Sequence, residues 1–423
     1  MPKLLLYTIT LLLVSCTPRP GAKTGADKYA NNLTLFESNP LNPYFEIYHT
    51  DNDSSTLYFR ILSDEVLYNR QAIDDDYTAR LRFSYRMYNA ENSKIFLDSG
   101  SVITKDVVKE KFSHFVLGQL PIKSVNGKIN RILIKLEDLN RNVEVESQLY
   151  LNKLNPYNPQ YFKLRNSRNE MIFGSYVNRA ETLLVENQLG NASRFFIKVF
   201  EEDFPYPPPP FSRITNKPVG RFPTTTKVKH PNELRNFNVM IPAKGYIIIQ
   251  ADTSSQLGCA VFNFGEDYPE TTTPEGLIRP LRYLCTKKEY EKMMDSEDRK
   301  KASDKFWLGI SPSKERARAL IKEYYDRIHK ANAFFSSYVP GWKSDRGMVS
   351  IVLGWPTTIK RLRDSEIWIY GDGKQFRATT FKFIQYDNPF STNDYRLERD
   401  DSYKYIWYKA VDSWRAGRIF TLN

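Results

Sequence analysis

Cysteine and histidine are scarce in this chain of 423 residues, which has three cysteines and four histidines. The histidines are far apart, and none has the spacing of a metal site. The sequence also lacks a glycine-rich phosphate loop, a G-x-S-x-G nucleophile elbow and an H-E-x-x-H helix. We therefore predict no metal, no cofactor and no catalytic residue.

Long apolar runs are absent too. Leu4–Val14, which follows Lys3, is too short to span a bilayer and is typical of an export signal. Leu13-Val14-Ser15-Cys16 then matches a bacterial lipobox, in which the cysteine is lipidated after cleavage. The alternative is a plain signal peptide followed by an incidental cysteine. We expect residues 1–15 to be a lipoprotein signal peptide and the acyl chains on Cys16 to anchor the protein in a membrane.

Charge of one sign does not dominate, although 61 basic residues against 49 acidic ones give a net charge of +12. Basic and acidic residues are mixed along the chain. One interpretation is attraction to an anionic surface such as lipid head groups. The interpretation that we favour is an ordinary solvated surface with a basic excess, and we predict no nucleic-acid partner.

Two β-rich regions follow a polar tether at residues 16–40. Residues 41–155 contain short alternating runs between polar turns, and Ala79–Met87 places apolar side chains on one face and arginines on the other. Roughly seven such runs favour an immunoglobulin-like β-sandwich. Residues 160–270 form a second β-rich domain, for which we also predict an immunoglobulin-like sandwich.

A proline-rich segment interrupts the second β-rich region at residues 204–211, which read Phe-Pro-Tyr-Pro-Pro-Pro-Pro-Phe. Such a run cannot pair inside a sheet and prefers an extended polyproline II conformation. It can dock into an aromatic groove on a partner. The alternative that we favour is a stiff loop crossing between strands.

Residues 273–423 have the pattern of an α+β domain. Apolar residues at three- and four-residue spacing predict a helix over 311–335, with Ser311 as its N-cap and an exposed Glu323–Arg327 pair. The apolar runs at 348–353, 366–370, 378–386 and 403–408 predict strands, and Trp414–Phe420 is expected to pack back on this domain.

Between the predicted helix and strand, residues 341–347 read Gly-Trp-Lys-Ser-Asp-Arg-Gly. Gly341 and Gly347 can adopt backbone angles closed to other residues, and Trp342 provides an apolar anchor. Ser344 and Asp345 can accept backbone N–H groups, and the Arg346 guanidinium can bind a carboxylate such as Glu366. Turn and capping chemistry accounts for every residue type here. The alternative is a small site in which Asp345 acts as a base and Arg346 holds an anion.

This motif, followed by Gly354-Trp355-Pro356 and preceded by Phe306-Trp307-Leu308 and Tyr324-Tyr325, resembles the signature of the GWxTD-domain lipoproteins. The resemblance implies a lipoprotein found mostly in Bacteroidota, whose biochemical role is not generally established. Ser344 replaces the usual threonine and keeps its hydroxyl, and Trp355 stands where proline is common. Residues 17–23 lack the acidic cluster frequent after the lipidated cysteine of surface-exported lipoproteins in that phylum. We therefore expect an outer-membrane lipoprotein that faces the periplasm.

Cys259 and Cys285 remain once the lipidated cysteine is set aside. An exported compartment permits a disulfide between them, and two buried free thiols are the alternative.

From these patterns we predict a non-enzymatic scaffold or accessory in an envelope assembly or secretion complex, with an envelope protein as its partner. One alternative is a hydrolase of envelope glycans or peptides that uses Asp345. Another is a binding module for peptidoglycan or anionic lipid.

Overall fold

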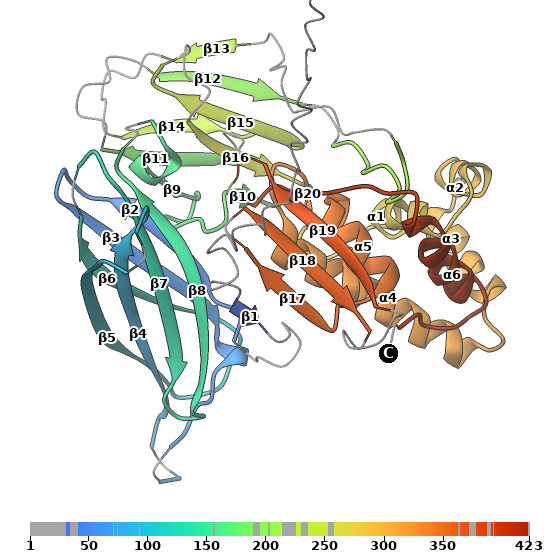
Figure 1. Cartoon of the computed structure of the whole chain (residues 1–423), viewed down its shortest axis with the longest axis horizontal. Coiled ribbons are helices and arrows are strands. Elements are labelled where there is room, and N and C mark those ends of the chain that lie inside the picture. The colour runs from blue at the N-terminus through green and yellow to red at the C-terminus, as the bar shows by residue number, and fades with distance from the viewer. Residues whose placement is uncertain are drawn as a thin grey trace, which may run out of the picture.

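Figure 1 shows the computed structural model of the chain, which consists of two β-sandwich-like units and a carboxy-terminal unit of mixed helices and strands. The structure describes residues 31–33, 41–70, 72–73, 75–92, 94–124, 126–154, 157–188, 195–201, 204–213, 226–229, 236–252, 258–362, 364–371, 378–386, 391 and 393–421. The predicted signal peptide and Cys16, the predicted lipidation site, lie outside these residues.

The first unit packs two antiparallel sheets face to face, with strand orders β2-β3-β6 and β5-β4-β7-β8. Their alternating side chains meet in one buried core, which includes Phe59, Phe83 and Ile134. The strands agree with the predicted alternation, and their bounds are β2 Tyr44–His49, β3 Ser54–Leu62, β4 Tyr77–Asn89, β5 Phe96–Val108, β6 Phe115–Lys123, β7 Ile129–Asp138 and β8 Val143–Asn152.

The second unit has a three-stranded sheet, β14-β11-β9, and a five-stranded sheet, β10-β16-β15-β12-β13. Val185, Ile197 and Val261 belong to the core shared by the two sheets. The strands are β9 Phe162–Arg165, β10 Tyr176–Val177, β11 Thr182–Asn187, β12 Phe195–Phe200, β13 Thr226–Lys229, β14 Asn236–Met240, β15 Gly245–Gln250 and β16 Cys259–Asn263.

The carboxy-terminal unit packs helices against a sheet of order β1-β17-β18-β19-β20 (Figure 1). The ring of Phe335 from α4 lies 5.3 Å from that of Trp368 on β18, so the long helix covers the sheet directly. The elements are α1 Pro274–Ile278, α2 Lys287–Met294, α3 Arg299–Gly309, α4 Lys314–Phe335, the short 3₁₀ helix η5 Gly341–Lys343, α5 Asp345–Leu353, β17 Thr358–Arg361, β18 Ser365–Tyr370, β19 Thr379–Gln385, β20 Tyr395–Leu397 and α6 Tyr403–Arg415.

Two predicted strands of this unit are helices. Residues 348–353 belong to α5, which is buried along its whole length. A helix buried all round has no polar face, so its short apolar run looks like that of a buried strand. Residues 403–408 form the first turns of α6, whose buried residues Ile406, Trp407, Ala410 and Trp414 follow a helical period. The 341–347 corner therefore joins two helices, and the prediction of a helix-to-strand corner was wrong.

Two details of the long helix α4 also differ from the prediction. The N-cap is Ser313, whose side chain accepts the amide of Arg316, instead of Ser311. Arg327 is buried, although we predicted an exposed pair with Glu323. Its guanidinium does bind Glu323 at 2.7 Å, and it also donates to the carbonyls of Ile351 and Phe420. The carboxy-terminal stretch that contains Phe420 thus packs back on the unit, as predicted.

Part of the predicted 16–40 tether is a strand. β1 (Asn31–Leu33) pairs antiparallel with β17, with Asn31 opposite Arg361 and Leu33 opposite Ile359. Residues 31–33 are thereby part of the sheet of the carboxy-terminal unit (Figure 1). None of the helices in the described ranges combines the length and the hydropathy that a membrane span requires.

Candidate functional site

The corner at residues 341–347 depends on two glycines that allow backbones to touch. A Cβ on Gly341 would lie 1.9 Å from the carbonyl oxygen of Ala331, and one on Gly347 would lie 1.9 Å from that of Gly341. Neither glycine has a positive φ angle. Their role is therefore close approach, and not the unusual backbone angles that the sequence suggested.

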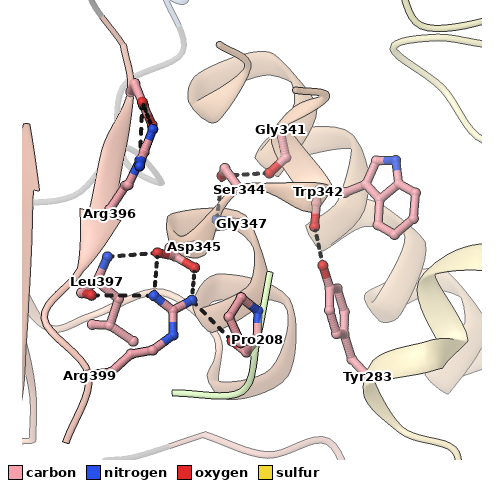
Figure 2. A network of polar contacts seen from close by, with 11 residues as sticks. Pro208, Tyr283, Gly341, Trp342, Ser344, Asp345, Gly347, Arg396, Leu397 and Arg399 are labelled. Atoms are coloured by element: carbon pink, nitrogen blue, oxygen red, sulfur yellow. Dashed lines mark hydrogen bonds and ion pairs between the residues drawn. The ribbon is translucent and has the colours of Figure 1, made fainter. Parts of the chain in front are cut away.

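Side chains of α4 and the corner satisfy the polar backbone of the tight turn. Asn332 accepts the amide of Trp342 at 3.0 Å, and Ser336 accepts that of Gly341 at 2.9 Å. Ser344 is the N-cap of α5, because its hydroxyl accepts the amide of Gly347 at 3.0 Å and donates to the Gly341 carbonyl at 2.7 Å (Figure 2). The predicted capping role of Ser344 is confirmed.

Asp345 forms a buried ion pair that sequence reasoning missed. The carboxylate is 4% exposed and accepts two N–H groups of Arg399, at 2.5 and 3.1 Å, and the amide of Leu397 at 2.8 Å (Figure 2). Burial raises the pKa of Asp345, and the Arg399 guanidinium opposes that shift. Arg399 lies between Glu398 and Asp400, and no local pattern in the sequence distinguishes it.

Arg346, the next residue, has a different set of partners. Its guanidinium lies 3.3 Å from Glu366 on β18, as proposed from the sequence, and it donates to the carbonyl of Asn393 at 2.9 Å. The same group lies over the rings of Phe335 and Tyr395, at 4.9 and 4.1 Å from their centroids. Arg346 therefore binds the corner to the sheet through charge and aromatic contacts together.

Trp342 and Lys343 contact the proline-rich strap, which we define as residues 204–211. The Tyr206 ring of the strap packs edge-on to Trp342 at 5.5 Å, and Tyr283 donates its hydroxyl to the Trp342 carbonyl at 2.8 Å. The ammonium group of Lys343 donates to the Phe204 carbonyl at 2.5 Å and lies 4.7 Å from the centre of the Tyr206 ring.

The carboxylate side of the corner holds the other end of the same strap. Arg399, fixed by Asp345, donates to the carbonyl of Pro208 at 3.1 Å (Figure 2). The amide of Asp400 donates to the carbonyl of Pro210 at 3.2 Å. The strap is thus bound by aromatic and polar contacts to other residues of the same chain. Residues 204–211 lie between strands β12 and β13, as expected for the crossing loop that we favoured, and the contacts described here are with the same chain.

Two surface grooves in the part of the chain that the structure describes contain no residue of the corner. One surface groove is lined by Tyr405, Lys409, Asp412, Ser413, Arg418 and Phe420, and a second by Pro274 and residues 296–300. Asp345 lines neither groove. Within the described residues, no group of three or more metal-binding side chains comes together.

Cys259 and Cys285 are both buried, free thiols. Cys259 lies in the core of the second sandwich, and Cys285 lies in the core of the carboxy-terminal unit. Burial raises the pKa of each thiol to about 12, so both are protonated and unreactive near neutral pH.

Comparison with known proteins gives one informative match. Residues 245–416 match the family model of the GWxTD domain, and this range includes the corner, both of its ion pairs and strands β15 and β16. A search among curated proteins finds no match.

Solved structures resemble this chain only in part. A beta-glucuronidase of Bacteroides uniformis is 12% identical, with a TM-score of 0.17, and the similarity covers 28% of this chain and 15% of that one. A glycosyl hydrolase family 2 member from Bacteroides cellulosilyticus is 9% identical, with a TM-score of 0.19, over 33% of this chain and 19% of that one. The chain spans less than one fifth of the length of these proteins, and similarity at this level carries no argument about activity.

Proposed function

We propose that this GWxTD domain-containing protein is an outer-membrane lipoprotein that acts as a non-enzymatic scaffold or accessory in an envelope assembly or secretion complex. The observation that carries the proposal is the internal use of the motif. Asp345 and Arg346 are both buried, and each is paired with an opposite charge of the same chain. Because both charges of the motif are paired within the chain, we favour a structural role for the motif over a catalytic one.

The rival hypothesis, a hydrolase that uses Asp345, requires a carboxylate that a substrate can reach. Arg399 and the Leu397 amide take up both oxygens of Asp345. A general base must lie within hydrogen-bond reach of the proton that it abstracts. Catalysis by Asp345 would therefore require the ion pair and the strap to move aside together.

The strap supports the scaffold hypothesis in a second way. It connects the second sandwich to the carboxy-terminal unit at several points along its length, from Phe204 to Pro210. A polyproline segment loses little entropy when it docks, because its conformation is already restricted. We propose that the GWxTD corner fixes the orientation of the two units, so that the protein presents one rigid surface to its partner.

We also propose that the sandwich-like units are immunoglobulin-like domains. The seven antiparallel strands of the first unit, in sheets of three and four, support this for residues 41–155. The eight strands of the second unit include a parallel pair, β10 with β16, which departs from that pattern.

We propose that the lipid anchor at Cys16 lies near the carboxy-terminal unit. Fourteen residues separate Cys16 from β1, which pairs with β17. An extended chain of that length spans at most about 50 Å. The GWxTD unit would then lie near the membrane, facing the periplasm, and the first sandwich would be available for a partner.

The test is purification of the tagged full chain from gently solubilised native membranes, together with metabolic labelling by palmitate. We expect Cys16→Ser to abolish the label and a membrane-protein partner to co-purify in a fixed ratio. A protein that is labelled but recovered alone would refute the scaffold function. Binding to isolated peptidoglycan sacculi, or to anionic vesicles in a salt-dependent manner, would then favour the binding-module alternative.

A further inference from the structure

The first sandwich has a long edge strand whose outer side is open. β5 (Phe96–Val108) ends the four-stranded sheet and pairs with β4 alone. It lies at the outer margin of the molecule, on the side away from the other units (Figure 1). An edge of this kind presents a row of unpaired N–H and C=O groups on which another strand can form.

Lys105 and the register shift near Leu97 are the two features of β5 that oppose such pairing, and residues 98–108 keep a regular register with β4. The neighbouring edge strand β6 carries Pro121, which lacks an N–H, whereas residues 96–108 contain no proline. Ile103 and Val107 lie on the outer face of β5 and are 45% and 54% exposed. These two side chains form an apolar rim that an added strand would cover.

Charge distinguishes this edge from the rest of the same sheet. Further in, basic residues have acidic partners on neighbouring strands, as in the pairs Arg82–Glu137, Arg86–Glu146 and Lys135–Glu144. At the edge, Lys105 on β5 stands directly opposite Arg80 on β4, and both side chains are exposed. Within the described residues neither has an acidic partner. Like charges placed opposite each other on a sheet are destabilising.

We propose that β5 accepts an extended segment of a partner protein by β-strand addition, and that this segment carries an acidic residue beside Lys105 and apolar residues beside Ile103 and Val107. The acid would relieve the Arg80–Lys105 repulsion, and the apolar residues would cover the rim. A second copy of this chain fits less well, because its own edge carries the same lysine. The inference rests on the proposed scaffold function, since it identifies the surface that such a partner would use.

The exposed side chains of β5 on either side of Lys105 determine the sequence of the peptide used to test this proposal. Ile103, Lys105 and Val107 alternate along the outer face, so the matching strand needs an apolar, acidic and apolar residue at every second position. The probe is the blocked peptide Thr-Val-Thr-Glu-Thr-Val-Thr with a fluorescent label. The control peptide has lysine in place of glutamate.

Binding is measured by fluorescence anisotropy with the purified full chain. We expect the wild type to prefer the acidic peptide by about five-fold, the value of one cross-strand charge pair, and Lys105→Glu to reverse that preference. The matched control is Lys305→Glu, an exposed lysine on α3 in the carboxy-terminal unit, which makes the same change in net charge. It should leave the preference unchanged.

Each other outcome overturns the inference. Absence of peptide binding, or a preference that Lys105→Glu and Lys305→Glu alter equally, would show that β5 does not select an acidic strand. A wild-type dimer in sedimentation that Ile103→Lys converts into a monomer would assign the edge to a second copy. If Lys105→Glu still co-purified the native partner in the original ratio, the scaffold function would stand and this surface would be the wrong one.

Discussion

Replacement of Asp345 by asparagine separates a structural role of the corner from a catalytic one. The substitution keeps the shape of the side chain and removes its charge, so Arg399 is left in a buried place without its counter-ion. The Arg399 side chain is 8% exposed, and its other described contacts are the carbonyls of Pro208 and Leu397. Breaking a buried ion pair by removing one partner costs ~3–5 kcal/mol.

The sequence supplies a selective probe for this measurement. All six tryptophans lie between residues 307 and 414, in the carboxy-terminal unit. Tryptophan fluorescence during urea unfolding therefore reports on that unit and not on the sandwiches. In a thermal scan the same loss lowers the unfolding midpoint by roughly 10 °C for a unit of this size.

The control for Asp345→Asn is Asp401→Asn, the same chemical change at a nearby exposed ion pair. Asp401 lies 2.8 Å from Arg213, and both side chains are largely exposed, so we expect a change below about 0.5 kcal/mol. If Asp345→Asn left the stability at the wild-type value but abolished the function in the cell, the structural argument would be refuted. The hydrolase hypothesis would then regain support.

Three further predictions concern other positions. Trp342→Ala should lower the free energy of unfolding of the carboxy-terminal unit by ~3–5 kcal/mol, because the ring is buried against the strap; fluorescence that unfolds at the wild-type urea concentration would contradict this. Gly347→Ala should prevent soluble expression, since its Cβ would meet a backbone oxygen, whereas Gly309→Ala, with no atom within 4 Å of its Cβ, should express normally. His49, whose pKa is lowered to about 4 by burial, is neutral in the folded first sandwich and titrates near pH 6.5 when unfolded. The contribution of neutral His49 to stability is therefore present above pH 6.5 and is lost as the pH falls toward 4. Hydrogen exchange should show about 2 kcal/mol less protection of that unit at pH 5 than at pH 7, and His49→Gln should remove this difference.

The sandwich strands could be predicted because each buries one face. Leu81, Phe83 and Tyr85 are buried, while Arg82 between them is exposed, so the sequence itself alternates. The same argument failed for α5. Every residue from Asp345 to Leu353 is buried, so its sequence has no polar face to reveal a helical period.

The corner itself was partly predictable. The capping role of Ser344 and the pairing of Arg346 with Glu366 follow from residue type, and the structure has both. The partner of Asp345 did not follow, because Arg399 is 54 residues away and lies in a polar stretch without periodicity. The position of the strap was equally hidden, since Tyr206 and Trp342 meet only when two units are packed together.

The sequence alone determined local features: the alternating strands, the cap of α5 at Ser344 and the lipobox that predicts an anchor. These depend on near neighbours in the chain and on the chemistry of single residues. Tertiary structure decided that α5 is a helix and that Asp345 forms a buried ion pair with Arg399. It also decided that the strap packs against the GWxTD corner and that β5 is an edge strand. Each of these depends on which distant segments share a buried surface, a property that no local pattern specifies.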